Sequence, residues 1–205
     1  MPNTLEEHVI YTRDEFRGWY YYPKMISVLK NEDIKYYLDI GANCGEFRNI
    51  IIENIPSITA SFLIEPEPNN FEFLRNHVSN KDECVFFNVA IGYSDSDFCD
   101  MVLSSNVGGH RITSNKSGTI PLKKLEDLGI PVVDLVKMDV EGLEFDILKN
   151  SEYLKKIKWM DIEFHQTSEQ ESTGFVKDFI EKNLENFDIV VHENTYGRCL
   201  LKNRL

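Results

Sequence analysis

Short apolar runs and helix-like stretches alternate along most of this chain. The apolar runs are rich in β-branched and aromatic residues and cover residues 36–40, 61–65, 84–91, 132–140 and 159–164. Between them, apolar residues recur with helical spacing at 46–55, 68–78, 142–149 and 175–184. Strands that alternate with helices in this way are typical of βαβ units. The pattern predicts an α/β fold with a mostly parallel sheet and helices on both of its faces.

Other segments predict antiparallel strands and a long loop. Residues 98–103 favour a strand that returns along the sheet, and residues 187–191 and 198–202 favour a hairpin at its edge. Residues 104–118 are rich in Ser, Asn and Gly and predict a loop of the kind that often serves a site. Asn150 follows the third helical stretch, where a residue in the left-handed conformation is expected.

The length of 205 residues fits a single domain, and no internal repeat or Pro/Gly-rich linker divides it. We expect residues 36–205 to form the α/β core and residues 1–35 to form a helical preface packed against it. The aromatic residues of the preface include Phe16, Trp19 and Tyr20, and they favour packing over a stacking platform for a ligand.

The negative net charge of the chain disfavours some classes of binding partner. The net charge is -12, whereas a protein that binds duplex nucleic acid usually carries a basic patch. An acidic chain is also disfavoured at an anionic membrane surface, and no apolar run approaches ~18 residues. The N-terminal residues lack the basic start and apolar core of a signal peptide. We therefore expect a cytoplasmic protein with a small-molecule partner, without nucleic acid or membrane. No stripe of residues indicates an oligomeric state.

The first predicted strand is followed by a loop whose residues are suited to binding a ligand. Residues 38–45 read LDIGANCG, so that Asp39 precedes a G-x-N-x-G spacing of Gly41, Asn43 and Gly45. Glycines between a strand and a helix let the backbone turn sharply and approach a ligand. The helix N-terminus then offers N–H groups and a positive dipole end to an anion. A dinucleotide loop would read G-x-G-x-x-G. The observed spacing suits a carboxylate with a nearby cationic amine, as in a methionine moiety, and Asp39 could take the amine.

Glu65 ends the second strand. A carboxylate at this place can accept hydrogen bonds from ribose hydroxyls. This feature fits NAD and S-adenosylmethionine equally, so it supports nucleoside binding without choosing between them.

Six segments of the chain form an ordered set of motifs: LDIGANCGEF (38–47), IEPEPNNFEFL (64–74), NVAIG (88–92), SSN (104–106), VKMDVEGLEFDIL (136–148) and IEFH (162–165). Together they resemble the FkbM family of S-adenosylmethionine-dependent methyltransferases. The resemblance implies a Rossmann-like fold with strand order 3-2-1-4-5-7-6 and S-adenosylmethionine as cofactor. It also implies methyl transfer to an oxygen, often on a sugar. It leaves out the flanks, where acceptor recognition often lies, and Asn150 stands where the family commonly has a glycine.

The predicted strand ends place more polar residues at the same edge of the sheet. Asn88 lies near the end of the third strand, where it could contact adenine or only cap a turn. Asp139 and Glu141 follow the fourth strand, with Lys137 able to pair with a carboxylate, and His165 follows the fifth. A hydroxyl acceptor must lose its proton during methyl transfer. Asp139, Glu141 and His165 are therefore the candidates for the general base.

Several alternatives remain open at the level of sequence. Asp139, Glu163 and His165 could instead hold a divalent metal that binds a sugar diol, although no metal is required by the pattern. An NAD-dependent oxidoreductase would need a G-x-G-x-x-G loop, which the chain lacks. A catalytically silent nucleoside-binding scaffold would keep the fold without needing the three candidate bases.

Overall fold

The computed structural model describes residues 2–105, 109–114, 118–166, 174–193 and 197–205. Its helices are α1 (Leu5–Gly18), α2 (Tyr21–Leu29), α3 (Glu46–Asn54), α4 (Pro68–His77), α5 (Glu144–Asn150) and α7 (Phe175–Asn183). Its strands are β1 (Tyr36–Ile40), β2 (Ala60–Ile64), β3 (Cys84–Phe87), β4 (Ala90–Ile91), β5 (Phe98–Val102), β6 (Arg111–Ser114), β7 (Ile120–Lys123), β8 (Leu135–Met138), β9 (Trp159–Glu163), β10 (Phe187–His192) and β11 (Arg198–Asn203).

Seven of these strands form one sheet in the order β10-β11-β9-β8-β1-β2-β3. Counted among themselves along the chain, they follow the order 3-2-1-4-5-7-6. The sheet is mixed, because β11 runs antiparallel to both β9 and β10 while the other pairs are parallel. The predicted α/β architecture with a mostly parallel sheet is therefore observed.

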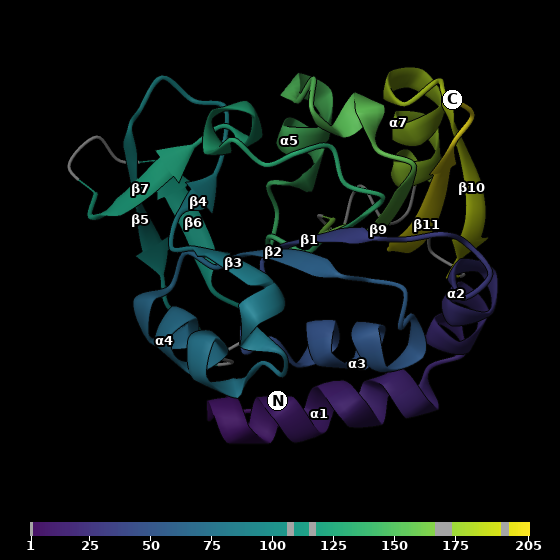
Figure 1. The fold of residues 1–205 in the computed structure, drawn as a ribbon. Coiled ribbons are helices and arrows are strands. Elements are labelled where there is room, and N and C mark those ends of the chain that lie inside the picture. The colour runs from purple at the N-terminus through teal and green to yellow at the C-terminus, as the bar shows by residue number, and fades with distance from the viewer. Residues whose placement is uncertain (1, 106–108, 115–117, 167–173, 194–196) are drawn as a thin grey trace.

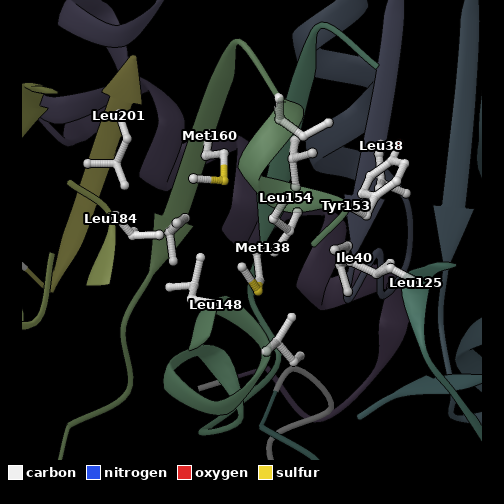
Figure 2. Packing of buried hydrophobic residues seen from close by; sticks show 14 of the residues in the cluster. Leu38, Ile40, Leu125, Met138, Leu148, Tyr153, Leu154, Met160, Leu184 and Leu201 are labelled. Atoms are coloured by element: carbon white, nitrogen blue, oxygen red, sulfur yellow. The ribbon is translucent and has the colours of Figure 1, made fainter. Parts of the chain in front are cut away.

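Helices cover both faces of this sheet. Figure 1 shows α3 and α4 on one face, with α1 beyond α3, and α5 and α7 on the other. Alternate residues of a strand point to opposite faces. Thus Leu38 and Ile40 belong to the apolar cluster on the side of α5 and α7, while Tyr37 belongs to the cluster on the side of α3. In the first cluster Met138 of β8 lies beside Ile40 of β1, and Met160 of β9 lies on the other side of β8 (Figure 2).

A second sheet is inserted between β3 and β8, and the sequence pattern did not predict it. Its order is β4-β7-β5-β6. The strand predicted at 84–91 ends at Phe87, and Ala90–Ile91 pairs with β7 instead of continuing the main sheet. The predicted loop at 104–118 contains β6, which pairs antiparallel with β5. The partner of β4 is distant in the chain, which local composition does not reveal. The partner of β6 is the preceding strand, but the polar composition of residues 104–118 favoured a loop.

Asn150 does not adopt the left-handed conformation expected for it. It is the final residue of α5, and its side-chain Nδ2 donates to the Asp146 carbonyl oxygen at 2.8 Å. The next residue, Ser151, leaves the helix with φ -80°, in extended conformation. Ser151 is fully buried and its Oγ donates to Glu126, so tertiary contacts set the direction of the exit.

The two N-terminal helices differ in how they are held. In α2, Tyr21, Tyr22, Met25 and Leu29 are buried. No residue of α1 is buried, although the structure describes the whole helix. Arg13 of α1 pairs with Glu46 and Glu53 of α3. Among the described residues, no helix has the length and apolar character needed to cross a membrane.

Candidate active site

A cavity of about 390 Å³ opens where the main strands end. Its lining includes the residues that follow β1, β2, β8 and β9, which all end at the same edge of the sheet. Small-molecule sites commonly have volumes of ~300–1,000 Å³ and, in open α/β sheets, lie beyond the carboxyl ends of the strands. The position and the volume are therefore those of a ligand site.

The glycine loop turns under the end of β8. Gly41 has φ +83°, and a Cβ at this position would lie 1.8 Å from the carbonyl oxygen of Asp139. The N–H groups of Gly41 and Ala42 both donate to the Ile64 carbonyl oxygen, and Gly45 N–H donates to Ala42. A Cβ on Gly45 would meet Val78 at 2.4 Å. The loop's glycines thus serve close packing inside the protein, and these N–H groups already have acceptors there.

Asp39 lies behind the loop as part of a buried ionic network. It is fully buried, and it is not among the described residues that line the cavity. Its Oδ2 accepts a hydrogen bond from Tyr37 at 3.0 Å, and Lys137 Nζ lies 3.4 Å from its Oδ1. Lys137 also donates to the Gly41 carbonyl oxygen at 2.7 Å and lies 3.5 Å from Asp139.

The charges of this network shift one another's pKa values. Burial raises the pKa of Asp39. Burial alone would lower the pKa of Lys137, but the carboxylates of Asp39 and Asp139 raise it overall. Lys137 therefore stays charged and ties the glycine loop to β8.

Glu65 lines the cavity and is held by two backbone groups. Its Oε2 accepts from Asn43 N–H at 2.8 Å and its Oε1 accepts from Glu67 N–H at 2.9 Å. Burial raises the pKa of Glu65 to about 7. Asn88 is not among the described lining residues. Its Nδ2 donates to the carbonyl oxygens of Glu65 and Pro66, so it fixes the backbone that carries the carboxylate.

The structure brings the three predicted base candidates together. Nε2 of His165 lies 3.3 Å from Glu141 and 3.9 Å from Asp139. One ligand atom from each of these residues lies within 4.8 Å of the other two. Nδ1 of His165 lies 2.9 Å from Glu144, a fully buried carboxylate that also accepts from the N–H groups of Val140 and Gly142.

These contacts shift the pKa values of the three side chains. Burial alone would lower the pKa of His165, but the hydrogen bond to Glu144 and the surrounding carboxylates raise it to about 9. Burial raises the pKa of Glu141. Burial would also raise the pKa of Asp139, but the charges of Lys137 and His165 lower it overall.

Glu163 does not join this group. Its carboxylate pairs with Nη1 of Arg198 at 2.6 Å, while Nη2 of Arg198 pairs with Asp161 at 2.7 Å. Arg198 is 2% exposed and lines the cavity, and sequence reasoning missed it. The signal was present in the apolar run at 159–164, because two acidic residues within a buried strand require a cation.

The walls of the cavity come from segments that the motifs did not include. His8, Tyr11, Thr12 and Glu15 of α1 form one wall. Met101, Gly109, His110 and Ile112, from the β5–β6 hairpin of the second sheet, contribute to another. Ser104 and Ser105 are exposed and are not among the described lining residues, and Asn106 lies outside the described residues.

Comparisons with known proteins agree with this geometry. A family model described as the methyltransferase FkbM domain matches residues 39–188. A methyltransferase FkbM structure from Methylobacillus flagellatus KT is similar, with a TM-score of 0.58 and 17% identity over 89% of this chain. This chain covers 46% of that protein, less than half of its length.

Two further solved structures are similar. The fibrillarin/Nop5p complex gives a TM-score of 0.54 with 17% identity, over 88% of this chain and 80% of the other. Sp1610 of Streptococcus pneumoniae, a putative tRNA (m1A22) methyltransferase, gives 0.51 with 10% identity, over 88% and 68%. At these identities the similarity shows the fold alone, and it confirms the Rossmann-like prediction. No curated protein sequence matches.

Proposed function

The chain belongs to the FkbM methyltransferase family, and from that premise we propose that it transfers a methyl group from S-adenosylmethionine to a hydroxyl of a small molecule, with a sugar as the acceptor class. The membership confirms the resemblance carried by the sequence motifs. S-adenosylmethionine is the methyl donor, and it supplies the electrophilic methyl group of its sulfonium.

One observation carries the proposal. A single cavity has the glycine loop and Glu65 on its lining, together with Asp139, Glu141 and His165. The first set comes from the strand ends where a nucleoside binds in open α/β sheets, and the second offers groups that can accept a proton. Donor and acceptor would therefore meet within one enclosed space. Such alignment can contribute ~7–11 kcal/mol to the lowering of the barrier.

The residues present fit the nucleoside. Each carboxylate oxygen can accept two hydrogen bonds, and each oxygen of Glu65 accepts one from the backbone. Each oxygen can therefore accept a further bond from a ribose hydroxyl. Asp39 remains our candidate for the amine contact: its Oδ1 lies 3.4 Å from Lys137 Nζ and forms a hydrogen bond with no other described residue. Gly41 and Asn43 line this half of the cavity, and Gly45 and Asn88 would support it from behind the lining.

The acceptor half needs a group that removes the hydroxyl proton. Asp139, Glu141 and His165 are the candidates, and a well-placed base contributes ~10²–10⁴-fold to the rate. The methyl carbon forms its new bond to the acceptor oxygen as the bond to sulfur breaks, and the hydroxyl proton passes to this group or to solvent.

Calorimetric titration with S-adenosylmethionine, S-adenosylhomocysteine and NAD tests the donor. We expect both sulfur nucleosides to bind and NAD not to bind. Glu65→Ala should weaken nucleoside binding, whereas Glu72→Ala, which removes an exposed carboxylate of α4, should leave it unchanged. NAD binding without nucleoside binding would overturn the proposal. An acceptor screen with sugar nucleotides and isotopically labelled methyl donor then tests the acceptor class.

A further inference from the structure

Three side chains of types that can ligate a metal meet in the part of the cavity assigned to the acceptor. Asp139 and Glu141 come from the segment after β8, and His165 comes from the segment after β9. One oxygen or nitrogen atom from each lies within 4.8 Å of the other two. Two carboxylates with one imidazole form a ligand set that suits a divalent cation such as Mn²⁺.

The imidazole is held in the orientation that a metal ligand requires. Glu144 is fully buried and accepts from Nδ1 of His165 at 2.9 Å. Two backbone N–H groups, of Val140 and Gly142, hold the Glu144 carboxylate in place. Metal-binding histidines usually donate their second ring nitrogen to such a carboxylate, which fixes the tautomer and the direction of the ring. Here that contact leaves Nε2 directed at Asp139 and Glu141.

Among the described residues, the carboxylates around this point outnumber the cations that pair with them, which are Lys137 and the imidazole of His165 when it is protonated. Four carboxylates, those of Asp39, Asp139, Glu141 and Glu144, lie close together. In the described part of the chain, the ion pairs that they make with lysine or arginine all involve Lys137. Buried carboxylates are normally paired with cations or coordinate metals. Asp161 and Glu163 lie outside this group of carboxylates, because both are paired with Arg198.

We infer that Asp139, Glu141 and His165 bind one divalent cation, with Glu144 as the carboxylate that positions His165. The inference deepens the proposed function and rests on it for its purpose: a cation here would hold the acceptor oxygen and lower the pKa of its hydroxyl, so that the proton leaves more readily. The ligand set differs from the sequence alternative, because Glu141 takes the place of Glu163.

The test is titration of the protein with Mn²⁺ alone, followed by electron paramagnetic resonance of the unbound ion. We expect saturable binding of one ion per chain. Asp139→Asn, Glu141→Gln and His165→Gln should each weaken it by at least about tenfold, and Glu144→Gln by about 10–100-fold. Glu163→Gln is the matched control, since it changes a carboxylate of the same cavity that Arg198 already holds. Its affinity should stay within about threefold of the original.

The inference is overturned if binding is not saturable, or if Glu163→Gln weakens it more than the other substitutions do. Circular dichroism on each variant separates loss of the site from loss of the fold. The same samples are titrated with S-adenosylhomocysteine. Nucleoside binding without Mn²⁺ binding would refute the cation site alone, and Mn²⁺ binding without nucleoside binding would refute the proposed function alone.

Discussion

Gly41 lies where β1 ends and the chain turns beneath the carbonyl oxygen of Asp139. Its φ of +83° is a conformation that residues with a Cβ rarely adopt. Two independent constraints therefore meet at this residue, one from its own backbone and one from the neighbouring strand. The sequence indicated a glycine loop that lets the backbone approach a ligand. In the structure, the glycine at position 41 is needed because the loop packs against the backbone of Asp139.

Gly41→Ala should therefore cost more stability than an alanine at another left-handed glycine. Gly129 is the matched control, with φ +66° and nothing within 4 Å of an added Cβ. We expect a loss of ~1–2 kcal/mol for Gly129→Ala from backbone strain alone. For Gly41→Ala we expect at least about 3 kcal/mol, because β1 and β8 must also separate. Urea denaturation measures both, and equal losses would contradict this explanation.

Glu65 should make cofactor binding depend on pH. Ribose hydroxyls donate to the ionised carboxylate, so binding favours the deprotonated form. With the pKa of Glu65 raised to about 7, affinity for S-adenosylhomocysteine should increase by about tenfold from pH 6 to pH 8 and level off above that. Glu65→Gln cannot ionise, so its affinity should be lower and its profile flatter. Titration calorimetry across this range is the measurement, and an unchanged slope in the variant would contradict the assignment.

Helix α1 has no fully buried residue and is held by ion pairs together with the packing of Phe16 against Tyr22 and Phe47. Arg13 joins it to Glu46, which is 1% exposed, and to Glu53 on α3. Regions with few buried apolar contacts open most easily. Because His8 and Glu15 of the same helix line the cavity, opening of α1 would also open the site.

Arg13→Ala should accelerate hydrogen exchange across residues 5–18 and leave β1 and β8 unchanged. The substitution removes the ion pairs with α3, and it leaves Glu46 buried with His77 as its remaining ionic partner. Arg17→Ala is the control, since the ion pair that Arg17 makes with the described residues is an exposed one with Asp14 of the same helix. Exchange detected by mass spectrometry gives the comparison. Similar rates in the two variants would show that Arg13 does not anchor the helix.

Across the whole molecule, local pattern predicted what lies close in sequence. The strand before Gly41, the carboxylate at the end of β2 and the acids after β8 all follow from apolar runs and the residues that end them. The pairing of β4 with β7, the α1 wall and the Arg198 network depend on distant partners. Arg198 and Asp161 are 37 residues apart, Arg13 and Glu53 are 40 apart, and Tyr21 and Asp161 are 140 apart. A pattern read over one strand or helix does not span separations of this size.

Arg198 of β11 contacts β9, α2 and α3. It pairs with Asp161 and Glu163, and its guanidinium lies over the rings of Tyr22 and Phe47 at 5.0 and 5.1 Å from their centroids. Arg198→Met should cost ~3–5 kcal/mol, since it leaves buried carboxylates without their cation. Arg204→Met is the control, because Arg204 pairs with Asp188 at an exposed position, and it should cost less than ~1 kcal/mol. Urea denaturation compares them, and similar costs would contradict a structural role for the buried pair.

Arg198 also bears on the order in which the protein can fold during its synthesis. The ribosome produces Asp161 well before Arg198, and at ~5–20 residues per second the 37 residues between them take about 2–7 s. Throughout that interval the nascent sheet has β9 without β11. Tyr21 and Asp161 then lack their contacts with the guanidinium of Arg198. The main sheet cannot reach its final packing while its C-terminal strand is still being translated, so a ribosome that pauses within the codons for β10 or β11 would hold the chain in an incomplete form.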